Sequence, residues 1–154
     1  MKYSAIITDI EGTTSRISFV TEVLFPYATA ELPAFIRANA AQTAGAEQLA
    51  ACRSLMQQPA ATVDAIIAQL LEWIAKDQKI TPLKALQGMV WQQGYQSGAF
   101  SGHLYQDAFT ALTQWQQQGI KLYVYSSGSV QAQQLLFQYS DVGDITPLFS
   151  GYFD

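Results

Sequence analysis

The sequence offers few side chains that could bind a metal through sulfur or an imidazole nitrogen. Cys52 is its only cysteine and His103 its only histidine. A disulfide within the chain is therefore excluded, and a His-based metal site has no second member. A lone thiol suits a reducing compartment, and because Cys52 lies in a helix-like stretch we interpret it as a buried structural residue.

Positive charge and long apolar runs are also scarce. Eight lysines and arginines stand against twelve acidic residues among 154, which gives a net charge of −4, and the basic residues are scattered. Without a basic stripe, the chain is not expected to bind nucleic acid. No apolar run reaches the length of a membrane span and no signal peptide is visible, so we expect a cytoplasmic protein without a membrane partner.

A short apolar strand followed by two carboxylates is the most informative feature that the sequence does contain. The first strand is predicted over residues 3–9, and its apolar run at residues 5–7 is typical of a parallel sheet covered on both faces. Asp9 and Glu11 follow with i, i+2 spacing, which points both acids to the same side. Open α/β sheets bind ligands at this edge. One acid can attack a phosphorus atom while the other handles the proton of the leaving group.

A second buried strand is predicted over residues 120–125, and it ends in serines. Ser126 and Ser127 precede Gly128 and Ser129, after which a helical pattern begins. Hydroxyls and free backbone N–H groups at a helix N-terminus can bind an anion. A simple serine N-cap is the alternative interpretation. The pairing with two acids on a neighbouring strand favours a phosphate site.

The long segment between these two strands is helical in its periodicity. Apolar residues recur at helical spacing across residues 66–74, and Thr81 and Pro82 are typical of the N-cap and first residue of a helix. A segment of roughly 80 residues is too long for a simple crossover between parallel strands. We therefore interpret residues 19–98 as a helical cap inserted after the first strand.

The rest of the chain is then a Rossmann-like core made of residues 1–18 and 99–154. Within it the sequence predicts helices over residues 105–118 and 129–139 and a short strand between residues 145 and 153. Strands alternating with helices are typical of an α/β fold with a parallel sheet.

The motifs resemble those of the haloacid dehalogenase-like phosphatases. In that superfamily Asp-x-Asp-Gly-Thr follows the first strand and a Ser or Thr ends the second, and here Glu11 replaces the usual second Asp. The resemblance sharpens to the enolase-phosphatases of methionine salvage and covers essentially the whole chain. It rests on Trp91 and on residues 9–14, 17–20, 24–27, 83–88, 124–130, 133–137, 143–145 and 151–154. It implies a doubly wound parallel sheet with an α-helical cap after the first strand.

The resemblance also implies a Mg²⁺-dependent phosphoric monoester hydrolase. Such an enzyme converts a small phosphorylated diketone, 2,3-diketo-5-methylthiopentyl-1-phosphate, to acireductone and phosphate through an aspartyl-phosphate. Asp9 is then the nucleophile and a metal ligand through its carboxylate. Glu11 is the acid and base and a metal ligand through its backbone carbonyl, while Ser126 and Ser127 bind the phosphate of the substrate.

Two later motifs of the family have no counterpart in this sequence. They are a lysine soon after the segment at residues 151–154 and an acidic residue at the end of a later strand, and no lysine or arginine follows Lys121. We therefore expect a C-terminally truncated chain with an incomplete sheet, weak Mg²⁺ binding and little turnover. Residues 5–8 would form an exposed edge through which copies self-associate, whereas the full-length enzyme is expected to be a monomer.

Two other functions stay open. The chain can be a capped phosphatase of the same superfamily that acts on a different small phosphate ester, or a truncated fragment without catalytic activity. Turnover of the diketone against a panel of phosphate esters tests the first alternative, and zero turnover of generic phosphatase substrates with Mg²⁺ would favour the second.

Overall fold

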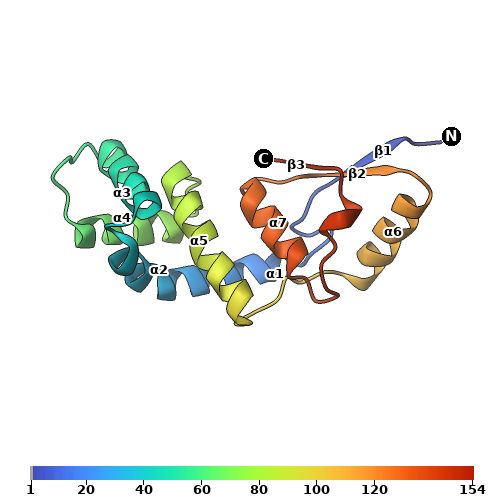
Figure 1. The fold of residues 1–154 in the computed structure, drawn as a ribbon, viewed down its shortest axis with the longest axis horizontal. Coiled ribbons are helices and arrows are strands. Elements are labelled where there is room, and N and C mark those ends of the chain that lie inside the picture. Colours follow the sequence, from blue (N-terminus) through green and yellow to red (C-terminus); the bar gives the residue numbers. More distant parts are fainter. Residues whose placement is uncertain (1) are drawn as a thin grey trace. The chain divides into compact units, whose positions relative to one another are not determined.

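The chain folds into two units in the computed structural model, which describes residues 2–154 (Figure 1). The sheet unit comprises the residues up to Leu24 together with Gln92–Asp154, and the helical unit is Phe25–Trp91. The helical unit is thus inserted, in sequence, between two segments of the sheet unit. The cap expected at residues 19–98 extends a few residues beyond the helical unit at both ends.

A parallel sheet of three strands forms the centre of the sheet unit. Its strands are β1 (Ala5–Thr8), β2 (Lys121–Tyr125) and β3 (Gly151–Phe153), in the order β1-β2-β3. The register pairs Thr8 with Val124 and Tyr125 with Phe153. All three strands lie within the ranges that the sequence predicts. Unbroken apolar runs mark β1 and β2, but only β2 has buried residues, because one face of the sheet is not covered.

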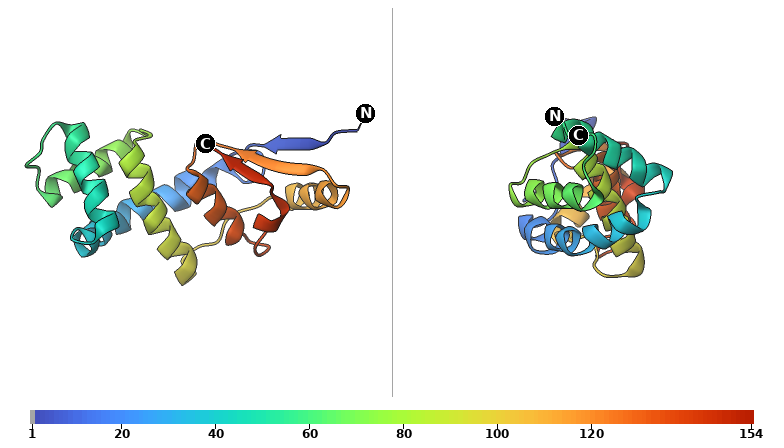
Figure 2. Two further views of the ribbon diagram at one scale, coloured as in Figure 1. Left: turned by 45° about the horizontal axis from the view of Figure 1, so that its top comes forward. Right: turned by 90° about the vertical axis from the view of Figure 1, so that its left-hand side faces the viewer.

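Helix α6 (Gln106–Gln117) leads into β2, helix α7 (Val130–Gln138) follows it on the way to β3, and both cover the same face of the sheet (Figure 2). On that face Leu122 and Val124 of β2 are completely buried. Helix α6 stops before Gly119, which lies just after its C-cap Gln118 and whose φ of +81° is the left-handed conformation that glycine adopts without strain. The predicted helices over residues 105–118 and 129–139 are therefore confirmed.

Three short elements complete the sheet unit. α1 (Ile17–Phe19) and the π-helical turn η1 (Val20–Leu24) lead into the helical unit, and the 3₁₀ turn η2 (Thr146–Leu148) precedes β3.

The helical unit consists of α2 (Phe25–Asn39), α3 (Thr43–Met56), α4 (Val63–Ala75) and most of α5 (Thr81–Ser97). Its core gathers the apolar faces of these helices: Leu32, Ile36, Leu49, Cys52, Ile66, Ile67, Leu70, Ile74, Leu83, Leu86 and Val90. Cys52 is completely buried, and burial raises the pKa of its thiol to about 11. This confirms its interpretation as a structural residue. No helix within residues 2–154 combines the length and apolar character needed to cross a bilayer.

The start of α5 differs by one residue from the prediction. The Ile80 carbonyl accepts the N–H of Lys84 (2.9 Å), which places Ile80 at the N-cap and Thr81 and Pro82 inside the first turn. The prediction of Thr81 as N-cap is therefore wrong. The physical reason is that the N–H groups of the whole first turn have no partner within the helix, so proline is tolerated at its second position as well.

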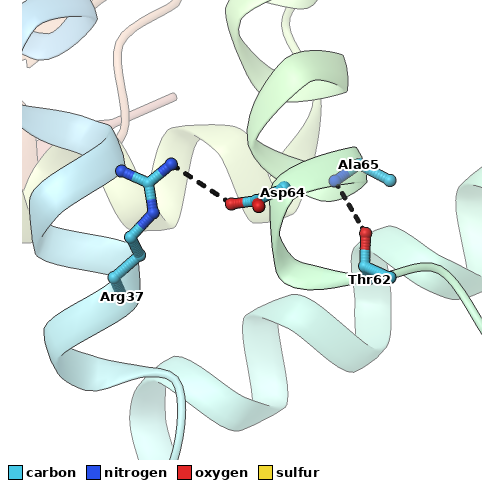
Figure 3. Close-up of polar contacts among 4 residues, drawn as sticks. All are labelled: Arg37, Thr62, Asp64 and Ala65. Carbon is cyan, nitrogen blue, oxygen red and sulfur yellow. Dashed lines mark hydrogen bonds and ion pairs between the residues drawn. The ribbon is translucent and has the colours of Figure 1, made fainter.

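The start of α4 shows how one side chain fixes a helix end. Thr62 Oγ1 accepts the N–H of Ala65 (3.1 Å), and Asp64 of the first turn forms an ion pair with Arg37 of α2 (3.1 Å), as Figure 3 shows. The side chains of Arg37 and Asp64 are 58% and 80% exposed, so water weakens their attraction. The hydroxyl cap is therefore the stronger contribution to the start of α4.

We expect Thr62→Ala to lower the free energy of unfolding by about 1 kcal/mol, because it leaves a first-turn N–H without its acceptor. Arg37→Ala should cost less than about 1 kcal/mol, since it removes only an exposed ion pair. Urea unfolding followed by circular dichroism measures both. Thr29→Ala, at an exposed position inside α2, is the control. A Thr62→Ala variant as stable as this control would contradict the capping role.

Both edges and one face of the sheet remain open among the described residues, because β1 and β3 each pair with β2 alone. β1 pairs only with β2, and Ile7, Tyr125 and Phe153 on the face opposite α6 and α7 are 67%, 61% and 51% exposed. Parallel sheets normally have both faces covered. An edge strand also presents unpaired N–H and C=O groups to other chains.

We therefore expect this chain to associate with copies of itself in a concentration-dependent way. Ile7→Lys should suppress the association, because it places a charge on the apolar edge strand. Leu55→Lys alters a residue of similar exposure (56%) on α3 and serves as the control. Sedimentation velocity measures the distribution of species. A wild-type chain that stays monomeric up to high concentration would overturn this expectation.

Candidate active site

A cavity of about 350 Å³ lies at the carboxyl ends of β1 and β2. Its lining consists of Ile7, Thr8, Asp9, Glu11, Tyr125, Ser126 and Ser127. The pairing of Thr8 with Val124 makes the two strands end at nearly the same level, so that the loops that follow them meet. All four residues singled out in the sequence, two acids and two serines, line this one cavity within the sheet unit.

The turn after β1 holds the two acids outward by burying the residue between them. The side chain of Ile10 is only 5% exposed, and its carbonyl accepts the N–H groups of Thr13, Thr14 and Ser15 (3.0 to 3.1 Å). Asp9 and Glu11, on either side of Ile10, are exposed. The i, i+2 spacing thus acts as expected, with the apolar residue inside and the carboxylates at the cavity.

Hydrogen bonds within the turn, and others to residues 103–105, fix the turn in place. Gly12, with φ of +75°, donates its N–H to the Ser15 carbonyl (2.7 Å). The Thr14 carbonyl accepts the N–H of Tyr105 (2.8 Å), and the Arg16 N–H is donated to Nδ1 of His103 (2.9 Å). His103 therefore acts as an acceptor that anchors the turn. A lone histidine in a single sequence carries no signal for this role.

The serines after β2 have two different roles: one caps α7, and the other two line the cavity. Ser129 caps α7 by accepting the N–H of Ala132 (3.2 Å), which is the ordinary N-cap that the sequence left open. Ser126 is buried and donates its N–H to the Phe153 carbonyl (3.1 Å), while Ser127 is exposed at the cavity. The capping interpretation therefore applies to Ser129, and the serines of the cavity are the two before it.

The charge of the cavity is carried by the two carboxylates. Neither Asp9 nor Glu11 forms an ion pair within residues 2–154, where the ion pairs all lie in the helical unit. Oδ1 of Asp9 accepts the N–H of Ile10 (2.7 Å), which orients the carboxylate. Two carboxylates that line a cavity and have no ion-pair partner attract a cation.

The oxygen donors of the cavity fit a magnesium ion. Magnesium in proteins is typically bound through one or two carboxylates, with water and substrate phosphate completing its octahedron. Asp9 and Glu11 provide such a set, and the Glu11 carbonyl accepts no hydrogen bond from the described part of the chain. No cluster of three or more potential ligands among His, Cys, Asp and Glu occurs in residues 2–154. These residues therefore do not form a metal site in which every ligand comes from the protein.

A parallel sheet, a carboxylate pair after its first strand, a serine loop (residues 126–129) after its second and a helical insertion together define an α/β phosphatase of the haloacid dehalogenase-like type. Comparison with known proteins identifies the group within this class. The chain is 62% identical over 154 residues to enolase-phosphatase E1 of Pseudomonas syringae pv. syringae (strain B728a), which covers 100% of this chain and 68% of that protein. It is 56% identical over the same length to enolase-phosphatase E1 of Azotobacter vinelandii, again covering 68% of that protein.

The chain belongs to the enolase-phosphatase E1 family, as its motifs predict. The crystal structure of the UTR4 protein from Saccharomyces cerevisiae is similar as well, with a TM-score of 0.81 and 35% sequence identity over 99% of this chain and 67% of that one. No protein-family model matches the chain.

We expect the cavity to bind Mg²⁺ through Asp9. In ¹H–¹⁵N NMR spectra the N–H signals of Ile10 and Gly12 should shift on Mg²⁺ titration, and Asp9→Asn should abolish the saturable shift because an amide oxygen carries no charge. Asp107→Asn is the matched control, since Oδ1 of Asp107 also accepts the next N–H (2.9 Å) but lies on α6. Equal shifts in the wild type and Asp9→Asn would contradict the site.

Proposed function

We propose that this chain carries the phosphatase site of an enolase-phosphatase of methionine salvage. Its substrate is 2,3-diketo-5-methylthiopentyl-1-phosphate and its products are acireductone and phosphate. The observation that carries the proposal is that Asp9, Glu11, Ser126 and Ser127 line one cavity. The names of the relatives support the reaction. A cytoplasmic location is part of the proposal and is supported by the single, reduced Cys52.

Asp9 is the nucleophile in this proposal. Its Oδ1 accepts the Ile10 N–H, so the carboxylate is oriented before the substrate arrives and Oδ2 is left to attack phosphorus. The bond from Oδ2 to phosphorus forms as the bond from phosphorus to the substrate oxygen breaks. The result is an aspartyl-phosphate and a free enol.

Glu11 transfers protons in both halves of the dephosphorylation, which follows enolisation of the diketone. It lines the same cavity as Asp9, on the same side of the turn, and would protonate the leaving oxygen as it departs. The same carboxylate then removes a proton from the water that hydrolyses the aspartyl-phosphate. Glu11 therefore acts first as an acid and then as a base.

The phosphate group binds at the start of α7. The Ser127 side chain lines the cavity, and the N–H groups of Ser127 and Ser129 donate to no acceptor within residues 2–154. Such free N–H groups at a helix N-terminus favour a bound anion. The carboxylate of Asp9 and the carbonyl of Glu11 would hold Mg²⁺, which supplies positive charge between the anionic nucleophile and the phosphate.

We expect phosphate release from the diketone by this chain to be slow, because no lysine or arginine lines the cavity. Asp9→Asn should reduce it to background, since the amide is nearly isosteric but is not a nucleophile. The measurement is phosphate release with Mg²⁺, with Asp107→Asn as the control that keeps wild-type activity.

Three results would contradict this proposal in different ways. Release from other phosphate esters but not from the diketone would indicate a different phosphatase of the superfamily. No release from any ester by the folded wild-type chain would indicate a fragment without activity. Undiminished release by Asp9→Asn would reject Asp9 as the nucleophile.

A further inference from the structure

Gln133 on α7 is a buried polar residue directly behind the serine loop. Its side chain is 2% exposed, whereas Gln131, Gln134 and Gln138 on the same helix are exposed. Glutamine is seldom fully buried unless its amide has partners. The reason for its burial must therefore be sought in the hydrogen bonds of the amide.

The amide nitrogen of Gln133 contacts three backbone carbonyls. Nε2 lies 2.8 Å from the oxygen of Phe153, 2.9 Å from that of Gly128 and 3.3 Å from that of Ser126. The first of these oxygens belongs to the last residue of β3, and the other two belong to the loop between β2 and α7. The contacts also fix which way the amide faces, because a flipped amide would point its own oxygen at three acceptors.

These contacts set the direction of the N–H groups in the serine loop. In a planar trans peptide the C=O and N–H bonds point in opposite directions. The Ser126 carbonyl shares its peptide with the Ser127 N–H, and the Gly128 carbonyl shares its peptide with the Ser129 N–H. Since both carbonyls point at Gln133, both N–H groups point away from it. They are the two loop donors without an acceptor within residues 2–154, since the N–H of Ser126 is donated to the Phe153 carbonyl and that of Gly128 to Oγ of Ser126.

We infer that Gln133 is a positioning residue that aims the N–H groups of Ser127 and Ser129 at the phosphate. The inference rests on the proposed function, because it assumes that the anion bound at this loop is a phosphate. Gln133 itself does not touch the substrate. It acts by holding the peptide planes on either side of the Ser127–Gly128 peptide.

The other end of the amide supports a functional role over a purely structural one. Oε1 of Gln133 is buried and has no hydrogen-bond partner within the described residues. A buried unpaired acceptor destabilises a fold, whereas an apolar side chain of similar size would avoid this cost. α7 also has its own cap in Ser129 and its own apolar anchors in Leu136 and Phe137. Stability alone therefore does not explain a glutamine here.

The test compares Gln133→Met with Gln134→Met. Both remove an amide from α7, but only the first removes the hydrogen bonds to the loop. In Gln133→Met we expect the N–H signals of Ser127 and Ser129 in ¹H–¹⁵N NMR spectra to shift or broaden, with the signals of β2 unchanged. The affinity for inorganic phosphate in the presence of Mg²⁺, read from the same spectra, should fall roughly tenfold. Gln134→Met should resemble the wild type in both respects.

Gln133→Glu adds a reversible form of the same test. Burial among three carbonyls raises the pKa of a carboxyl group, so at about pH 5 the side chain is neutral and can donate one hydrogen bond. As the pH rises through that raised pKa, the ionised carboxylate repels the carbonyls. The loop signals should therefore be close to those of the wild type at low pH and depart from them as the pH rises. A role in stability alone would not predict this reversal at the two N–H groups.

The outcomes separate this inference from the proposed function. Unchanged Ser127 and Ser129 signals in Gln133→Met would overturn the inference, as would uniform changes across β2 and α7 that match a loss of global stability in urea. If the Ser127 and Ser129 signals of the wild-type chain do not shift when phosphate is added, the proposed phosphate site is contradicted. In that case the spectra of Gln133→Met and Gln133→Glu without phosphate still decide whether Gln133 orients the loop.

Discussion

The parallel pairing of β1 with β2 is the interaction on which the site depends. It runs from Ala5 opposite Lys121 to Thr8 opposite Val124, and so joins segments more than a hundred positions apart in the chain. A shift of one residue in this register would turn every side chain of a strand to the opposite face. The acids after β1 and the serines after β2 would then no longer share a cavity. The burial of Leu122 and Val124 under α6 and α7 selects the register that is observed.

Around this pairing, buried backbone contacts orient the polar groups that face the cavity. Ile10 is buried between Asp9 and Glu11 and collects three N–H groups on its carbonyl, which sends the carboxylates outward. The amide nitrogen of Gln133 contacts three carbonyl oxygens. We infer that these contacts turn the N–H groups of Ser127 and Ser129 outward. In both arrangements the hydrogen bonds that hold the loop lie on its inner side, and the carboxylates or the free N–H groups lie on its outer side. A phosphate site needs this division, since preorganised dipoles need no reorientation when the anion binds.

The strands and the residues of the cavity could be predicted because their signals are local. An unbroken apolar run ended by polar residues marks a strand of a parallel sheet, and Asp9 and Ser126 each follow the strand that such a run forms. Gln133 could not be recognised in this way. In a single sequence it is one glutamine among several on an amphipathic helix, and its partners at residues 126, 128 and 153 meet only in the folded chain. The role of His103 could not be predicted for the same reason, because its hydrogen-bond partner is the backbone N–H of Arg16.

The proposed mechanism depends most on the covalent bond that Asp9 forms to phosphorus during turnover. Borohydride reduces an aspartyl-phosphate but not a free carboxylate, so quenching the chain with borohydride during reaction with the diketone and Mg²⁺ marks the nucleophile. Mass spectrometry of the digested chain then locates the modified residue. We expect reduction of Asp9 alone, dependent on substrate and absent from Asp9→Asn. Phosphate release without modification of Asp9, or with modification of Glu11 in its place, would contradict this mechanism.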